Sequence, residues 1–191
     1  PTLIKKESYV AGIDGVLNAV IVDGKPVGQS IIQTTEPIED SVRQAVAGAP
    51  FVPTRLYCSD LPRCAQLAER LALRWNIEWE PTTELREMHF GEWEGRHYDE
   101  IDAADNLRWR RWCEDWRNEA PPGGESVEQL TNRVSSWLAR KAPSERDVLV
   151  THAGVIRALR VLSGATWDEA MNSPCPFLGW QGHDCVISPV V

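Results

Sequence analysis

The sequence predicts an α/β fold, a three-layer sandwich whose mostly parallel central sheet carries helices on both faces. Short apolar runs typical of strands alternate along the chain with longer segments of helical periodicity, which is the pattern of α/β proteins. The clearest unit is "RDVLVTHAGVIRALRVLSG", with a buried strand at Val148–Val150, a turn at His152 and then a helix. The 191 residues suit a single domain, 1–191, with a full hydrophobic core.

The remaining elements follow from local patterns. A short first strand is expected at Leu3–Ile4, and Val16–Ser30 is expected to form a hairpin, because Asp23-Gly24 supplies the positive φ values of a tight turn. A strand is predicted at Thr54–Ser59, and "DCVISPVV" is predicted as a final edge strand. Helical spacing predicts helices over Ile38–Gly48, Leu61–Trp75, Tyr98–Arg117 and Gly123–Ala142.

The composition is that of an ordinary soluble protein, with 42% hydrophobic and 25% charged residues. No apolar run is long enough to span a bilayer and the start shows no signal-peptide pattern, so a cytoplasmic location without membrane contact is expected. The net charge of −8 argues against a nucleic-acid partner, although a local pocket of Arg and Lys can still bind a small anion. Five cysteines without a CxxC pair favour reduced thiols over disulfides or a zinc site.

Two segments place polar residues just past the ends of predicted strands, where ligands bind in parallel sheets. His152 precedes the small residue Ala153 and the amides that begin a helix, and such amides can donate to an anion; a structural turn histidine explains the spacing equally well. In "CSDLPRC", Ser59 ends a strand, Asp60 could cap the next helix, and Arg63 could clamp a phosphate or carboxylate with two prongs. Taken alone, Arg63 is more simply a surface residue.

The segment "ELREMHFGEWEG" packs four glutamates around aromatic residues and glycines: Glu84, Glu87, Glu92 and Glu94. A carboxyl beside apolar groups has a raised pKa and can act as a general acid, although a solvated acidic loop is the simpler reading. "PPGGES" is typical of a helix start that Glu125 or Ser126 caps. Three tryptophans share one side of a predicted helix, which indicates packing: Trp109, Trp112 and Trp116.

Four blocks, taken together and in this order, resemble the histidine phosphatase superfamily, also called phosphoglycerate-mutase-like. They are "CSDLPRCAQLAERLA", "LREMHFGEWEGR", "PPGGES" with "RV" further on, and "VLVTHAGVIRAL". They run from about Arg55 to about Leu162 and are most similar to α-ribazole-phosphatase-like members. The resemblance implies chemistry without a metal or cofactor and, because members are often dimers, a homodimer.

In that family, a histidine in an N-terminal Arg-His-Gly motif attacks phosphorus and becomes phosphorylated. A second histidine and two arginines hold the phosphate, and a carboxylic acid protonates the leaving oxygen. By resemblance, Arg63 matches the second phosphate arginine, Glu87 the acid and His152 the second histidine. Glu125 and Ser126 lie in the block that borders the pocket.

The first block departs from the family pattern. After the expected strand the family would read Arg-His-Gly-Glu, whereas this chain reads "KKES", which puts Lys5 at the arginine position and Lys6 at the nucleophile position. No histidine precedes His89, and His89 lies only two residues from Glu87 and would have to point the opposite way. A lysine with its usual pKa of about 10.4 is mostly a cation at neutral pH, so the two lysines suit holding an anion better than attacking it.

Three interpretations stay open at this point. The chain binds a phosphorylated or carboxylated small molecule with little phosphatase activity; or Glu87 and His152 perform acid and base chemistry without a phosphoenzyme; or the chain is an active phosphomonoesterase and the first strand is misaligned. The expected catalytic residues are Glu87 and His152. The expected substrate-binding residues are Arg63, Lys5, Lys6, Ser59, Ala153, Glu125 and Ser126.

Overall fold

The computed structural model describes residues 8–14, 21–22, 25–26, 28–30, 38–144, 146–175 and 180–185. In this part of the chain, five strands form one sheet in the order β5-β4-β6-β1-β7. The pairs β5–β4, β4–β6 and β6–β1 are parallel, and β7 lies antiparallel at the edge. The five strands are Ser8–Asp14 (β1), Arg55–Ser59 (β4), Glu78–Thr82 (β5), Asp147–Thr151 (β6) and Trp180–Cys185 (β7).

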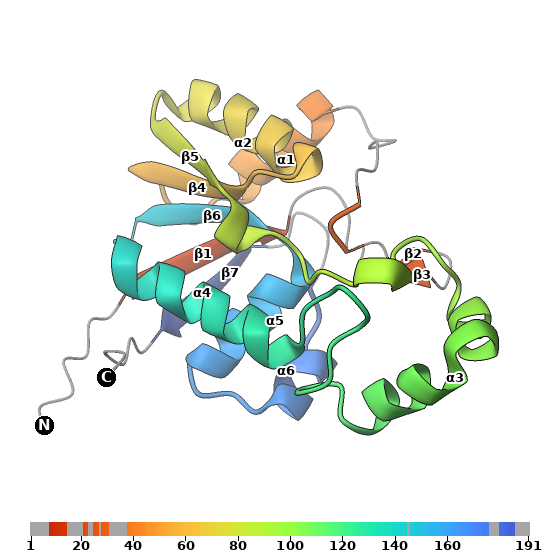
Figure 1. Ribbon diagram of the computed structural model, residues 1–191. Coiled ribbons are helices and arrows are strands. Elements are labelled where there is room, and N and C mark those ends of the chain that lie inside the picture. The colour runs from red at the N-terminus through yellow and green to blue at the C-terminus, as the bar shows by residue number, and fades with distance from the viewer. Residues whose placement is uncertain are drawn as a thin grey trace, which may run out of the picture.

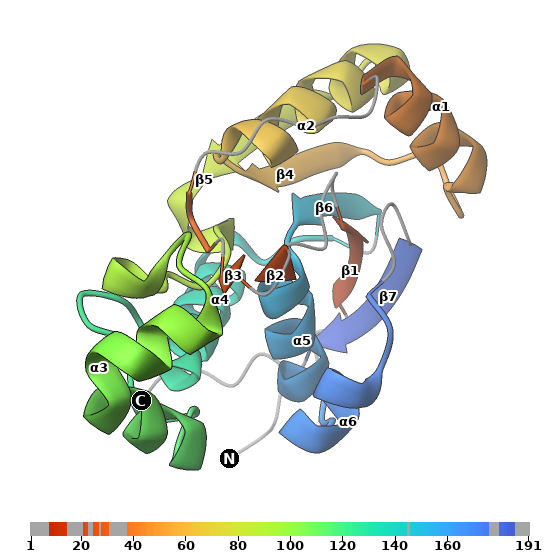
Figure 2. The same cartoon turned by 90° about the vertical axis from the view of Figure 1, so that its right-hand side faces the viewer.

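Helices cover both faces of this sheet, so the predicted three-layer sandwich is confirmed (Figure 1). α1 and α2 lie on one face and α4 and α5 on the other, while α3 stands to one side of the sheet (Figure 2). The helices are Ile38–Gly48 (α1), Pro62–Trp75 (α2), Tyr98–Glu114 (α3), Val127–Lys141 (α4), Ala153–Leu162 (α5) and Trp167–Asn172 (α6). Two 3-10 turns, Thr83–Leu85 (η1) and Gly91–Trp93 (η2), lie between β5 and α3.

Two apolar clusters, one on each face of the sheet, hold the layers together. Successive side chains of a strand point to opposite faces, so Leu56 and Cys58 of β4 pack with α1 and α2, whereas Tyr57 between them packs with α4. Tyr57 meets Trp137 of α4 edge to face, with 5.2 Å between the ring centroids. Every residue of β6 is buried, as expected for a central parallel strand covered on both faces.

The helix predictions are confirmed, with small differences at the ends. α2 begins with Pro62, where the missing N–H would have had no partner in the helix. It ends before Asn76, which adopts a left-handed φ of 54°. Asp60 does not cap α2 as predicted; its carboxylate pairs with the guanidinium of Arg86, with 2.6 Å between Oδ2 and Nη2. This stronger, charge-assisted partner explains why the cap is not made.

The strand predictions at the two ends of the chain differ from the sheet. The strand next to β6 is Ser8–Asp14 and not Leu3–Ile4, because Tyr9, Val10 and Ile13 supply the aromatic and β-branched residues that suit a sheet. The last strand lies at the edge of the sheet, as predicted, and pairs antiparallel with β1; it begins earlier than expected, at Trp180, and is described to Cys185. Leu3, Ile4 and residues 186–191 lie outside the described residues.

The predicted hairpin within Val16–Ser30 is confirmed where it is described. Ile21–Val22 (β2) pairs antiparallel with Lys25–Pro26 (β3), and the turn between them lies outside the described residues. Among the helices that the structure describes, none combines the length and apolar character needed to cross a membrane. Among the cysteines with described side chains, Cys58, Cys113 and Cys175 are free thiols.

The two faces of α2 give a direct test of the core. Leu71 is fully buried, whereas Leu73 is 70% exposed on the same helix. We expect Leu71→Ala to lower the free energy of unfolding by about 2–5 kcal/mol, because it removes apolar burial and leaves a cavity. Leu73→Ala is the matched control and should change it by about 0.5 kcal/mol or less. Urea denaturation measures both, and equal losses would contradict the described packing.

Candidate active site

The candidate site forms where the carboxyl ends of parallel strands β4 and β6 meet. Cys58 is the register partner of Val150, so the residues that follow these strands come to the same edge of the sheet. There, His152 Nε2 lies 2.8 Å from Ser59 Oγ, and both residues are buried. β1 ends at this edge too, because it runs parallel to β6 with Asp14 beside Thr151.

His152 is a neutral imidazole at neutral pH. Burial lowers its pKa well below the usual value, and the positive charges of Arg63 and Arg133 lower it further. Cys64 Sγ lies 3.4 Å from Nε2, so the ring is enclosed by Ser59 on β4 and Cys64 on α2. A neutral, enclosed imidazole can accept or donate a hydrogen bond and can take up a proton, which suits a base or a phosphate ligand.

Arg63 is buried in the first turn of α2, and the predicted two-pronged clamp is already engaged. Its Nη2 donates to the carbonyl of Gly28 at 2.7 Å and its Nη1 to the carbonyl of Ser30 at 3.0 Å. Its Nε is buried without a hydrogen-bond partner among the described residues. A buried donor of a charged group is costly to leave unpaired.

Glu87 is a buried carboxyl bound to the start of α5. Its oxygens accept from the N–H of Gly154 at 3.1 and 3.2 Å, and Oε1 also accepts from the N–H of Met88 at 2.9 Å. Burial raises its pKa, and these N–H donors and the charges of Arg63 and Arg157 oppose the rise only in part. Glycine at position 154 leaves room for this contact, because a Cβ there would collide with Oε1 of Glu87 and displace it.

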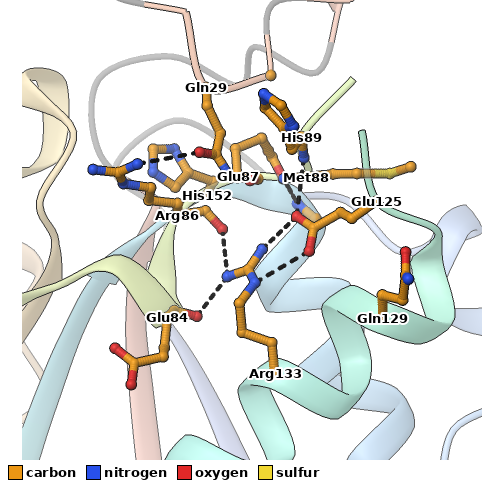
Figure 3. A network of polar contacts seen from close by, with 12 residues as sticks. Gln29, Glu84, Arg86, Glu87, Met88, His89, Glu125, Gln129, Arg133 and His152 are labelled. Carbon is orange, nitrogen blue, oxygen red and sulfur yellow. Dashed lines mark hydrogen bonds and ion pairs between the residues drawn. The ribbon is translucent and has the colours of Figure 1, made fainter. Parts of the chain in front are cut away.

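An arginine–glutamate clamp holds the loop that carries Glu87 (Figure 3). Arg133 of α4 binds the carboxylate of Glu125 with two prongs, with Nη2–Oε1 at 2.6 Å and Nε–Oε2 at 3.2 Å. The same guanidinium donates to the carbonyls of Glu84 and Arg86, and Glu125 accepts from the N–H of His89. The clamp therefore fixes the backbone on both sides of Glu87.

A second carboxylate anchors the segment 28–30 over Arg63. Glu94 accepts from the N–H of Gln29 at 3.0 Å and from the hydroxyl of Ser30 at 2.6 Å. The side-chain amide of Gln29 reaches the carbonyl of Glu87 at 3.1 Å. Gly28 has a positive φ of 50°, and a Cβ there would meet the Glu94 carboxylate. The segment is thus held against the loop that carries the candidate acid.

The structure brings most of the sequence-predicted residues to this edge. Arg63, Glu87, His152 and Ser59 come together, and Ala153 begins α5 beside them. Ser126 caps α4, as predicted, by accepting from the N–H of Gln129. The hydroxyl of Ser126 and the carboxylate of Glu125 are thereby engaged by protein groups, so substrate contact by these two residues stays a prediction.

Lys5 and Lys6 lie outside the described residues. The sequence alignment placed the two lysines directly after the first strand. In the sheet, however, the strand beside β6 is β1, which begins at Ser8, after the lysines, and reaches the site at Asp14. Their role in anion binding stays a prediction. His89 does not replace a nucleophile in this arrangement: its ring is 43% exposed and faces Glu94 at 3.8 Å.

Three contributors to the site carry no assigned role in the sequence reasoning: Cys64, Glu94 and Arg133. Arg133 is the "R" of the "RV" pair that follows "PPGGES". Its place in this block could have identified it as a site residue. Glu94 was one of the four glutamates noted in the sequence and Cys64 lies in a quoted block, but no sequence pattern pointed to the contacts that these two residues make. Within the described part of the chain, no group of three or more His, Cys, Asp or Glu residues could hold a metal ion.

The raised pKa of Glu87 predicts a pH-dependent contribution to stability. The folded protein binds this proton more tightly than the unfolded chain, so the associated stabilisation is present below about pH 4 and is lost as the pH rises through the folded pKa. We expect the free energy of unfolding of the wild type, minus that of Glu87→Gln, to fall as the pH rises above about pH 4. Urea titrations across this range measure the difference.

Glu128→Gln on α4 controls for the loss of an exposed carboxyl. The difference in free energy of unfolding between the wild type and Glu87→Gln should change with pH more than the difference for Glu128→Gln does. If it does not change with pH, or changes only as much as the control difference, burial does not raise the pKa of Glu87.

Comparison with known proteins agrees with this geometry. A family profile for the histidine phosphatase superfamily (branch 1) matches residues 39–175. The chain is 30% identical to an adenosylcobalamin/alpha-ribazole phosphatase of Salmonella typhimurium over 144 residues, which are 71% of this chain and 68% of that protein. It is 34% identical to a glucosyl-3-phosphoglycerate phosphatase of Mycobacterium tuberculosis over 170 residues, covering 78% and 71% of the two chains.

Solved structures give the same result. The mycobacterial glucosyl-3-phosphoglycerate phosphatase superimposes with a TM-score of 0.74 at 26% identity, over 92% of this chain and 89% of that one. The alpha-ribazole phosphatase of Shigella flexneri shares the fold, with a TM-score of 0.78 at 21% identity, over 94% of this chain and 96% of that one. The resemblance drawn from the four sequence blocks is confirmed, and the chain belongs to the histidine phosphatase superfamily.

Proposed function

We propose that this protein binds the phosphate or carboxylate group of a small anionic metabolite and does not form a phosphohistidine. The observation that carries the proposal is the buried Nε of Arg63, which has no acceptor among the described residues and lies near His152 and Glu87. The amides that begin α5 add partial positive charge at the same edge of the sheet.

The residues after β1 support the second half of the proposal. β1 ends at Asp14, beside Thr151, and His152 follows Thr151; on β1 the next residues in sequence are Gly15 and Val16. No histidine occurs in residues 1–88, and the family profile begins only at residue 39. The chain thus offers no imidazole at the position where the family's attacking histidine is expected.

Acid and base chemistry can still operate with the groups that are present. Neutral His152 can take a proton from water while the water oxygen bonds to phosphorus, and protonated Glu87 can give its proton to the ester oxygen that leaves. Such a site works without the covalent step. In a well-studied hydrolase, loss of the nucleophile leaves about 10³–10⁴-fold catalysis over water, so we expect slow turnover at most.

A second candidate is an active phosphomonoesterase like the named relatives. The observation that favours it is Glu87, because a buried carboxyl with a raised pKa is a proton donor that pure anion binding does not require. The relatives at 30% and 34% identity are named as phosphatases of alpha-ribazole and glucosyl-3-phosphoglycerate compounds. On this reading the substrate is a phosphomonoester of a small alcohol.

The anion pocket is tested with Arg63→Ala. Orthovanadate and inorganic phosphate are the probes, and isothermal calorimetry measures their affinity. We expect the variant to bind about 10- to 100-fold more weakly, because a charged hydrogen bond contributes about 1.5–3 kcal/mol. Arg74→Ala, an exposed arginine at the other end of α2, is the control and should bind as the wild type does. Equal affinity in the Arg63 variant, with the fold intact by circular dichroism, would place the anion elsewhere.

The two candidate functions separate in a labelling and turnover experiment. The wild type is incubated with radiolabelled acetyl phosphate and examined for an alkali-stable label, which is the property of phosphohistidine. We expect no stoichiometric label, and p-nitrophenyl phosphate should be hydrolysed slowly or not at all. A stoichiometric alkali-stable label, with fast turnover that drops in Glu87→Gln, would establish the phosphomonoesterase and refute the absent phosphoenzyme.

A further inference from the structure

A cavity of about 310 Å³ is lined by Glu87 and by Gly154 at the start of α5. Its walls come from α3, the first turns of α4 and α5, and α6, helices whose places are visible in Figure 1. This volume falls at the lower end of the range for small-molecule sites, so it suits a small ring system. We call it the tryptophan cavity, after Trp112, Trp116 and Trp167.

The aromatic walls are braced from behind. Trp112 stacks on Trp109 with 5.4 Å between ring centroids and meets Trp93 edge to face at 5.9 Å. Trp116 meets Trp167 edge to face at 5.7 Å, with the guanidinium of Arg117 over its ring. Rings held in place by other rings form the cavity before a ligand arrives, which reduces the entropic cost of binding. The prediction that these tryptophans pack is therefore confirmed, and Trp112 and Trp116 also line the cavity.

Two buried donors on these walls have no acceptor. The Nε of Arg157 and the indole Nε1 of Trp112 are buried without a hydrogen-bond partner among the described residues. Arg157 is a cation on an otherwise largely apolar wall, so a ligand with a negative or strongly accepting oxygen would satisfy it. Flat aromatic surface and the cation of Arg157 together select an aromatic group that carries an acceptor.

Glu87 connects this cavity with the anion pocket. Glu87 lines the tryptophan cavity, and the charges of both Arg63 and Arg157 act on its carboxyl. A molecule with its phosphate at Arg63 and its ester oxygen at Glu87 would therefore extend its alcohol part into the cavity.

We propose that the tryptophan cavity binds the alcohol part of the ligand, and that this part is a flat aromatic group bearing a carboxylate or similar oxygen acceptor that pairs with Arg157. The inference rests on the proposed function, because it takes the anion pocket at Arg63 as the site of the phosphate. It deepens that proposal by naming the chemical class of the ligand.

Binding of two separate probes tests the inference. 2-Naphthoate reports on the cavity and inorganic phosphate reports on Arg63, and calorimetry measures both. We expect Arg157→Gln to weaken 2-naphthoate about tenfold or more and to leave phosphate unchanged, because only the cavity loses its cation. Arg63→Ala should do the reverse. Arg74→Gln on α2 is the matched control, and cyclohexanecarboxylate, which is not flat, should bind more weakly than 2-naphthoate.

A readout without any variant uses Cys113, the exposed thiol of the cavity lining. 2-Naphthoate should slow alkylation of Cys113 by iodoacetamide, identified by mass spectrometry, and inorganic phosphate should not. Absent naphthoate binding, unchanged affinity in Arg157→Gln, or unprotected Cys113 would each overturn the cavity proposal while leaving phosphate binding intact. Loss of phosphate binding alone, with naphthoate retained, would instead refute the proposed function.

Discussion

The carboxyl of Glu87, bonded to the N–H of Gly154, joins the two halves of the candidate site. One half is the loop between β5 and α3, and the other is the turn from β6 into α5. The contact is short enough that a Cβ at position 154 would displace the Glu87 carboxyl. The Arg133–Glu125 clamp holds the loop in the position that this contact requires. The buried Glu87 carboxyl, whose pKa burial raises, is therefore held at the start of α5, and Glu87 also lines the tryptophan cavity.

The elements with strong local signals were predictable from the sequence. The apolar face of α4 is buried as its spacing predicts, and the strand–turn–helix unit at His152 needs only a buried apolar run and a helix start. The first strand was misplaced because "TLI" and "SYVAGID" both suit a strand, and local propensity does not say which one pairs with β6. That choice depends on contacts between residues more than a hundred positions apart, as in the pairing of Asp14 with Thr151.

The site itself was predictable only in part. Arg63, Glu87 and His152 stood out because family blocks carry them. What each side chain does depends on distant partners: Arg63 binds two carbonyls of residues 28–30, and Glu125 is engaged by Arg133. Hydrogen-bond partners of this kind follow from the tertiary structure, and a single sequence contains no pattern for them. The tryptophan cavity belongs to the same class, because periodicity indicated that the rings pack but not that they leave a space.

The carbonyls that hold Arg63 act as an internal competitor for any anion. To bind the guanidinium with both Nη groups, an anion must displace Gly28 and Ser30, and two carbonyls would lose their charged donor. Each displaced group costs about 1–3 kcal/mol if it finds no new partner. For an anion that takes both Nη groups, occupancy and the docking of residues 28–30 are thermodynamically linked: tighter binding of Gln29 and Ser30 by Glu94 would weaken anion binding, and looser binding would strengthen it.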